Sequence, residues 1–257
     1  MIVYLGTHLI RWLAESTVPL FLSYRRLGSY KKLPVALTSW ALDSGGHTEI
    51  ALFGKWETPA PAYAASVRRY ATEIGNLQWA AIQDWNCRPA LLQKSGLSVK
   101  RHQELTVDSY EELLALDPSL PWVPVLQGWE PSDYLRHLDL YQARGHDLTK
   151  LSTVGVGTIA GRQDTAVVSA ILSGLHLRGV QIHAFGLKTK GLMRNQHFLV
   201  SSDSMAWSFH ARMEAPWAAC PVAHKSCSNC MPFAFHWYRG LLKRLQTHAV
   251  PQLLLSL

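Results

Sequence analysis

The sequence predicts an α/β protein that folds as a (β/α)₈ barrel of the TIM type. Seven short apolar runs recur along the 257 residues, and their apolar positions are continuous rather than alternating, which is typical of strands covered on both faces of a parallel sheet. Amphipathic stretches lie between these runs, and this alternation of strand and helix indicates α/β architecture. Seven strands in one compact chain favour a closed barrel over an open doubly wound sheet. Because no eighth strand is evident, the last unit is expected to be irregular.

The elements are expected in the following order. The helix at 131–145 has Pro131 near its start, Gly145 as its stop, and an apolar stripe that includes Tyr134 and Leu138. A second amphipathic helix is expected at 162–179, and a closing helix with a basic end at 233–248. The expected strands are 18–23, 35–42, 77–83, 122–127, 153–159, 180–186 and 197–202.

Composition sets limits on the partners of the chain. The formal net charge of +7 and the pI near 9.3 indicate excess positive surface, which suits a phosphate-rich partner. The sequence has no apolar stretch of membrane-spanning length and no signal-peptide pattern, so a cytoplasmic protein without a membrane partner is expected. We expect one domain, with a catalytic barrel at 1–212 and a small metal-binding appendix at 213–257 packed on it.

A cluster of cysteines and histidines predicts a metal site near the C-terminus. Cys220, Cys227 and Cys230 cannot all pair with one another, and a tetrahedral structural zinc with a fourth ligand explains their spacing better than disulfides do. His224 lies inside the cluster and is the first choice for that ligand, with His236 as the alternative. A Zn²⁺ whose four positions are all filled by protein would be structural.

Polar residues and glycines follow the ends of six expected strands. In a parallel barrel these carboxyl ends meet on one face, where barrel enzymes carry out their chemistry. Taken singly, an aspartate after a strand is more often a helix cap, but three in register with the other groups favour a common pocket. The groups are Asp43-Ser44-Gly45-Gly46, Gln83-Asp84-Trp85, Gln127-Gly128, Gly155 with Gly157, Phe185-Gly186 and Ser202-Asp203-Ser204.

This set of groups fits a guanine-type purine. A carboxylate such as Asp84 can accept from the ring N–H and the exocyclic amine, while Gln127 and backbone N–H groups near Gly157 can donate to the carbonyl. Phe185 offers a stacking surface. The two further carboxylates could carry out substitution at a sugar carbon, one as nucleophile and one as proton shuttle.

Six motifs, in the same order along the chain, resemble those of the tRNA-guanine transglycosylase superfamily, whose members are zinc-containing (β/α)₈ barrels. The resemblance is closest to its deazapurine DNA-modification branch in phages and bacteria, which implies exchange of guanine in DNA for 7-cyano-7-deazaguanine (preQ0) or a related base, and a link to phage defence. It spans nearly the whole chain. The motifs are "LDSGG", "IQDWNC", "VLQGW", "VGVGTIAGR", "HAFGLKTKG" and "SSDSMAW".

The resemblance implies a role for each matching residue. Asp203 matches the nucleophile that forms a covalent glycosyl ester at C1′, and Asp43 matches the general acid/base. The family has an aromatic residue and Gln after "DSGG" where this chain has His47-Thr48, so His47 either stacks on the base or lies in a surface loop. The remaining positions that match the base site are Asp84, Gln127, Gly128, Gly157, Thr158, Phe185, Ser44, Gly45 and Gly46.

Other residues are expected to contact the nucleic acid. Lys188, Lys190 and Arg212 are candidates for its backbone phosphates, and His102 and Thr106 for weaker substrate contacts. A duplex would have to expose its nucleotide by base flipping, whereas a single strand avoids that cost.

The expected partners are DNA, a free 7-deazaguanine base as co-substrate, and helper proteins encoded nearby. Three alternatives stay open: the same exchange in tRNA, a hydrolase that releases the base, and a non-catalytic nucleic-acid-binding barrel. The family's C-x-C-x₂-C zinc motif is not reproduced here, which leaves the fourth zinc ligand open between His224 and His236. The chain is shorter than the tRNA enzymes, and this difference favours the DNA branch.

Overall fold

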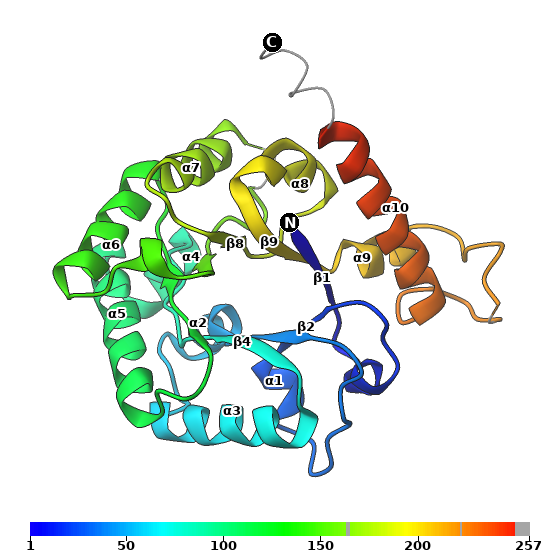
Figure 1. Ribbon diagram of the computed structural model, residues 1–257, viewed down its shortest axis with the longest axis horizontal. Coiled ribbons are helices and arrows are strands. Elements are labelled where there is room, and N and C mark those ends of the chain that lie inside the picture. Colours follow the sequence, from blue (N-terminus) through cyan, green and yellow to red (C-terminus); the bar gives the residue numbers. More distant parts are fainter. Residues whose placement is uncertain (163–164, 222, 250–257) are drawn as a thin grey trace.

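The computed structural model of the chain describes residues 1–162, 165–221 and 223–249. Its strands form one parallel sheet that curves into a barrel (Figure 1). The strands of the described residues are β1 (Ile2–Gly6), β2 (Leu20–Ser23), β3 (Trp40–Asp43), β4 (Leu77–Ala81), β5 (Trp122–Val123), β6 (Val125–Leu126), β7 (Val154–Val156), β8 (Ile182–Ala184) and β9 (Leu199–Ser204).

The sheet order is β5-β4-β3-β2-β1-β9-β8-β7-β6, so the two ends of the sheet meet where β5 and β6 adjoin in the chain. Pro124 separates β5 from β6 and has no N–H to donate, which interrupts the ladder at this point. β4 pairs with β5 through Ala81 and Val123, and β6 pairs with β7 through Leu126 and Val156. The β5–β6 segment therefore acts as one broken strand that closes the barrel.

Helices surround the strands on the outside, as Figure 1 shows for α3, α5, α6 and α7. Each carries an apolar face toward the sheet and has a recognisable start or stop signal. Pro131 opens α6, the Thr165 side chain caps α7, and Gly75, with φ +69°, follows the end of α3. The helices are α1 (Tyr24–Leu27), α2 (Gly46–Phe53), α3 (Ala60–Ile74), α4 (Pro89–Ser95), α5 (Val99–Leu116), α6 (Pro131–Ala143), α7 (Ala166–Leu177), α8 (Thr189–Asn195), α9 (Ala206–Met213) and α10 (Met231–Ala249), with 3₁₀ turns η1 (Ile10–Ala14), η2 (Leu148–Lys150) and η3 (Gln196–Phe198).

Aromatic rings from different strands fill the barrel interior. The His183 ring lies 4.6 Å from Trp79, 5.6 Å from Phe21 and 5.9 Å from Tyr4, measured between ring centroids. The Trp79 indole N–H donates to the Tyr4 hydroxyl at 3.2 Å. Rigid rings of this size leave little freedom to the side chains just above them, so this layer is a firm floor for the carboxyl end of the barrel.

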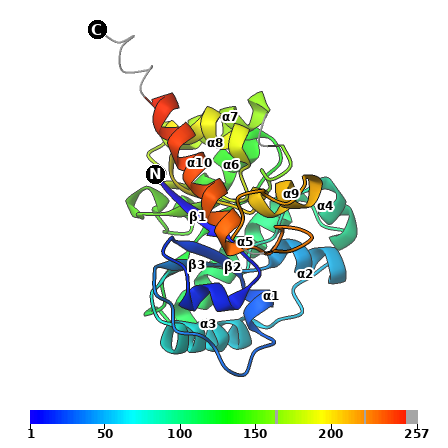
Figure 2. The same cartoon turned by 90° about the vertical axis from the view of Figure 1, so that its right-hand side faces the viewer.

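The C-terminal helix α10 lies along the side of the barrel (Figure 2). The Tyr238 hydroxyl donates to the carbonyl of Val3 in β1 at 2.8 Å, and α10 also contacts α8 and α9. The Trp207 indole of α9 donates to the carbonyl of Gly6 at 2.9 Å. Helices α9 and α10 are thus packed against the first strand. No helix of the described residues is long and apolar enough to cross a membrane.

The predicted fold class is confirmed, and the strand that the sequence prediction lacked is β1 at the N-terminus. The last expected run, 197–202, corresponds to β9, which is six residues long and pairs with both β8 and β1, so the unit that was expected to be irregular contains a complete strand. The expected strand 35–42 was too long: Val35 and Leu37 are 69% and 64% exposed, and β3 begins at Trp40. The Ala36 N–H donates to the Ile74 carbonyl at the end of α3, so this segment is held as a loop. In the expected helix 162–179, residues 163–164 lie outside the described residues.

Candidate active site

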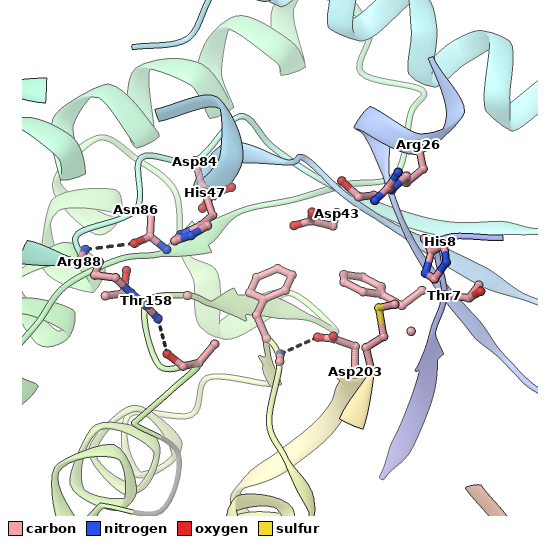
Figure 3. Close-up of a pocket in the computed structure, with 18 of the residues that line it drawn as sticks. Thr7, His8, Arg26, Asp43, His47, Asp84, Asn86, Arg88, Thr158 and Asp203 are labelled. Atoms are coloured by element: carbon pink, nitrogen blue, oxygen red, sulfur yellow. Dashed lines mark hydrogen bonds between the residues drawn. The ribbon is translucent and has the colours of Figure 1, made fainter. Parts of the chain in front are cut away.

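A cavity of about 640 Å³ opens at the carboxyl ends of the strands, and three aspartates line it. Asp43 ends β3, Asp84 follows β4, and Asp203 lies in β9. Figure 3 shows the Asp43 and Asp203 side chains facing the same space from different strands. The order of strands in the barrel has therefore brought together carboxylates that are 160 positions apart in the sequence.

Asp43 is the carboxyl group whose pKa is shifted most clearly by its surroundings in the site. Burial raises its pKa to about 7, and the nearby charges of Asp84 and Asp203 add to this rise. A hydrogen bond from Ser23 and one from the Gly45 N–H, at 3.1 Å, act in the opposite direction. A carboxyl group with this pKa exists in both protonation states near neutrality, as a general acid/base must.

The two glycines after Asp43 allow the chain to turn tightly from β3 into α2. Gly45 has φ +81°, a left-handed conformation that suits glycine, and a Cβ on Gly46 would lie 2.6 Å from the Asp84 carbonyl oxygen. Ser44, which precedes the two glycines, is fully buried, and its hydroxyl donates to Asp84 Oδ1 at 2.6 Å. The "DSGG" turn therefore packs directly on Asp84.

Asp84 is the centre of a buried polar network. Its Oδ2 accepts from the Gln127 amide, whose carbonyl oxygen accepts from the Thr158 hydroxyl. The Cys87 N–H donates to that hydroxyl at 2.9 Å. Burial raises the pKa of Asp84, while the hydrogen bonds from Ser44 and Gln127 lower it. The network fixes an acceptor, Asp84, beside an amide donor, Gln127.

The turn after β7 brings backbone close to this network. A Cβ at Gly157 would lie 2.2 Å from the Gln127 amide nitrogen, so only glycine fits there. Thr158 adopts a left-handed conformation with φ +57°, which is rare for a β-branched residue and is associated with functional sites. The Tyr134 hydroxyl of α6 donates to the Gly157 carbonyl at 2.8 Å and holds the turn in place.

Asp203 is held through one of its two oxygens. The Gly186 N–H donates to Oδ1 at 2.8 Å, and His183 Nε2 lies 3.5 Å from the same oxygen. Burial lowers the pKa of His183, so the ring is neutral, and its Nδ1 lies 2.9 Å from the Ser201 hydroxyl. With Ser201 donating to Nδ1, the Nε2 atom carries the proton and points at the carboxylate. Oδ2 has no such restraint among the described residues.

Aromatic side chains form one wall of the cavity. Phe185 and Phe21 both line it, with their ring centroids 6.0 Å apart. Phe185 also packs against His183 at 4.8 Å, which fixes the ring that faces the cavity. Its half-exposed face is a flat apolar surface of the size of a nucleobase.

Cationic side chains stand on two sides of the opening, as Figure 3 shows for Arg26 and Arg88. On one side, Arg26 and Arg212 add to the effect of burial in lowering the pKa of His8. On the other, Arg88 adds to burial in lowering the pKa of His47. The cavity thus has an acidic interior and a basic rim.

Nine of the predicted site residues line the cavity, and the others lie around it. The catalytic and base-binding roles of all of them stay predictions. Ser44 and Gly46 contact Asp84, and the Gly45 N–H donates to Asp43. Gly128 packs on Asp133 and Tyr134 of α6. The nine that line it are Asp43, His47, Asp84, Gln127, Gly157, Thr158, Phe185, Asp203 and Arg212.

Four further candidates lie outside the lining. Lys188 and Lys190 are exposed at the start of α8. His102 and Thr106 are buried in α5 behind the wall, where the His102 ring bonds to the Asn86 carbonyl at 3.0 Å and Thr106 accepts from the Trp85 N–H at 3.0 Å. These two therefore support the segment after β4 rather than reach the cavity.

Several residues that line the cavity were not predicted from the sequence. Thr7 and His8 follow β1, and they were overlooked because that strand was not recognised. Asn86 and Arg88 follow Asp84 directly, and Asn86 caps the turn by accepting from the Arg88 N–H at 3.0 Å. Their closeness to a candidate aspartate was the signal that could have identified them.

A separate cluster near the C-terminus could hold a metal ion. The ligand atoms of Cys220, His224, Cys227 and Cys230 all lie within 4.8 Å of one another. His224 Nε2 is 3.1 Å from Cys227 Sγ, and the Sγ atoms of Cys220 and Cys230 are 3.5 Å apart. His236, the alternative ligand, instead stacks on Trp217 with ring centroids 4.4 Å apart. The geometry thus favours His224 as the fourth member.

The chain was also compared with known proteins. A family model described as DpdA, DeoxyPurine in DNA protein A, matches residues 1–256. No match was found among curated proteins.

Proposed function

The chain belongs to the DpdA family, DeoxyPurine in DNA protein A, and we propose that it exchanges guanine in DNA for a 7-deazaguanine base through a covalent ester on Asp203. Membership of this family supports the interpretation that the chain is a transglycosylase that modifies DNA with a deazapurine. The chemical steps below are our own proposal, and they are argued from the cavity at the carboxyl end of the barrel.

In the first step Asp203 attacks the sugar. Because the Gly186 N–H and His183 restrain Oδ1, Oδ2 is the oxygen that forms the bond to C1′. The bond between C1′ and guanine N9 breaks, its electron pair leaves with the base, and Asp43 donates a proton to that base. The pKa of Asp43, about 7, supports its role as the acid.

In the second step the entering base reverses this chemistry. Asp43, now a carboxylate, accepts the N9 proton of the 7-deazaguanine while N9 attacks C1′. The bond between C1′ and Asp203 breaks, and its electron pair returns to the carboxylate. The Gly186 N–H stabilises the negative charge that reappears on Oδ1, as a donor in an oxyanion hole does.

The buried network suits recognition of a guanine-type base. Asp84 has lone pairs left to accept from the ring N–H and the exocyclic amine, and the second N–H of the Gln127 amide can donate to the base carbonyl. The Phe185 ring gives the base a surface on which to stack. Both bases in the exchange present this same edge, so one pocket serves both steps.

We propose that the cysteine–histidine cluster binds a structural Zn²⁺. Three thiolates and one imidazole are a common tetrahedral zinc set, and the spacing of the four ligand atoms suits an ion at their centre. The zinc would tie residues 213–257 together as a knot and closing helix on the barrel at 1–212, with residues 250–257 outside the described residues. It would not take part in the reaction because all four of its positions are filled.

The single observation that carries the proposal is the convergence of Asp43, Asp84 and Asp203 on one cavity with a basic rim. A protein that only bound phosphates would gain nothing from three carboxyl groups there. The test is incubation of the protein with labelled 7-cyano-7-deazaguanine and either DNA or tRNA, followed by nucleoside mass spectrometry. Label in DNA is expected. Label only in tRNA, or release of guanine without incorporation, would contradict the proposal.

A further inference from the structure

The helix after β9 presents an apolar stripe to solvent. Met205, which immediately precedes α9, and Phe209 and Met213 within α9 are 39%, 49% and 70% exposed, and they are spaced four residues apart. This spacing places the three side chains on one face of the helix. Large apolar groups exposed in a row are unusual on a protein surface and mark a site of interaction.

The stripe begins at the mouth of the cavity. Met205 lines the cavity itself, and so does Arg212, which lies seven residues further along the same face of the helix. Phe209 lies between them in this register. The exposed face of α9 is therefore continuous with the wall of the cavity that holds Asp203, which directly precedes the helix in the chain.

Cationic side chains border the stripe at Phe209 and near the cavity. Lys188 Nζ lies 5.4 Å from the centre of the Phe209 ring, and the ring is still half exposed. Arg212 and Arg26 are close enough to His8 for their charges to lower its pKa. A flat apolar surface bordered by cations suits a single nucleic-acid strand, whose bases stack on aromatic rings while its phosphates pair with the cations.

We propose that this face of α9, formed by Met205, Phe209 and Met213, binds the unpaired DNA bases next to the target nucleotide. This inference rests on the proposed function, and it adds the position of the DNA strand on the protein surface. The stripe spans about 12 Å along the helix, which is enough for two neighbouring bases. Arg212 and Lys188 hold the phosphates of these nucleotides, and the target base enters the cavity past Met205.

The test compares two phenylalanines of equal exposure. Phe53, at the end of α2, is also 49% exposed but belongs to a helix other than α9, so Phe53→Ala is the matched control for Phe209→Ala. Binding is measured by fluorescence anisotropy with a single-stranded oligonucleotide that carries 2-aminopurine beside its one guanine. Phe209→Ala is expected to weaken binding about tenfold with an unchanged salt dependence, and to remove the change in 2-aminopurine fluorescence on binding. Phe53→Ala should bind like the wild type.

Arg212→Gln tests the charged part of the same surface. It should weaken binding and also reduce the dependence of log affinity on log salt by about one unit. Equal binding by the Phe209→Ala and Phe53→Ala proteins would overturn the proposal. So would a change of oligomeric state in Phe209→Ala with unchanged DNA binding, because the stripe would then contact a second copy of the chain.

The outcome for α9 can be separated from that for the reaction. If the wild type forms no covalent adduct with DNA but binds it through Phe209, the proposed chemistry fails and the docking surface stands. If the adduct forms and the two phenylalanine variants bind equally, the chemistry stands and the docking surface fails.

Discussion

At the scale of single residues, the protonation of Asp43 is the property on which the proposed reaction most depends. Two further carboxyl groups and a buried position make its negative charge unfavourable, so it keeps its proton up to a pH of about 7. Asp203 has different contacts, because its Oδ1 accepts from the Gly186 N–H at 2.8 Å. Two aspartates in one cavity thus have different tasks because their surroundings differ.

The rate of adduct formation should therefore depend on pH. We expect the single-turnover rate to fall as the pH rises above 7, because Asp43 then loses the proton that the departing guanine needs. Asp43→Asn should react ~10²–10⁴-fold more slowly, without this fall. A wild-type rate that is constant between pH 6 and 8 would contradict the assignment.

The free energy of unfolding should also depend on pH through Asp43, and the direction of this dependence follows from the raised pKa. The folded protein holds the Asp43 proton up to about pH 7, whereas the unfolded chain loses it near the ordinary aspartate pKa of 3.8. Between these values the folded state binds more protons, so this group makes the free energy of unfolding fall as pH rises. Asp43→Asn should be more stable than the wild type at pH 8 by on the order of 1–2 kcal/mol, given screening by water in the cavity. Thermal unfolding at pH 8 and at pH 4 measures this gain, which should be small at pH 4.

His183 should act as a positioning residue for Asp203. Its Nε2–H faces Oδ1 at 3.5 Å, a contact that we expect to shorten once substrate is bound. In a glutamine the amide nitrogen takes the place of Nε2, whereas in an asparagine it takes the place of Nδ1. His183→Gln should therefore keep most of the activity, and His183→Asn should lose about tenfold in kcat with little change in KM.

The pair of variants controls for damage to the core. Both remove the ring from the aromatic layer around Tyr4 and Trp79, so both should lower the melting temperature. If kcat followed stability alone, the two variants would be equally impaired, and the positioning role would be excluded.

At the scale of elements, the turn after β7 shapes the base pocket. A side chain at Gly157 would displace the Gln127 amide and break its contacts with Asp84 and Thr158. Gly157→Ala should raise KM for the entering base about tenfold or more, since a hydrogen bond to a charged group contributes ~1.5–3 kcal/mol. Steady-state kinetics with varied base concentration measures this effect.

Gly240 offers the matched control for that substitution. It lies in α10, and a Cβ there would meet no atom within 4 Å. Gly240→Ala should leave KM unchanged and stabilise the helix by ~1 kcal/mol. An unchanged KM in Gly157→Ala as well would mean that Gln127 does not contact the base.

The knot between α9 and α10 should depend on its metal. We expect elemental analysis to find one zinc per chain, and Cys227→Ser to lose that zinc. If the lost zinc lowers the free energy of unfolding by ~3 kcal/mol, the melting temperature of this variant should fall by about 6–12 °C. His224→Ala should also lose zinc, while His236→Ala should retain it because His236 stacks on Trp217. Retention of zinc by His224→Ala with its loss from His236→Ala would reverse the choice of ligand.

At the scale of the whole molecule, the barrel could be predicted because strand and helix patterns are local. Continuous apolar runs such as 77–83 can be recognised without their neighbours, and the rule that parallel strands share one carboxyl end places Asp43, Asp84 and Asp203 on one face. β1 was not predicted because it is five residues long and begins at residue 2, before any helix has established the alternation of strands and helices. Thr7 and His8 were missed with it.

What depends on long-range packing could not be predicted. Nothing in the local sequence of Val35 and Leu37 reveals that the loop bonds to the end of α3. Likewise, the contact of His183 with Asp203 depends on the register between β8 and β9, which is irregular at Ile182 and His183. The apolar stripe of α9 has the periodicity of a core helix, and only its exposure distinguishes it as a surface.

The most direct test of the account is the mass of a denatured complex between the protein and DNA. After incubation of the wild type with a guanine-containing oligonucleotide and no entering base, we expect an adduct that survives denaturation, and peptide sequencing should locate the link at Asp203. Asp203→Asn should form none. An adduct linked to Asp43 or Asp84, or the absence of any adduct from wild type that still inserts the labelled base, would contradict the central claim.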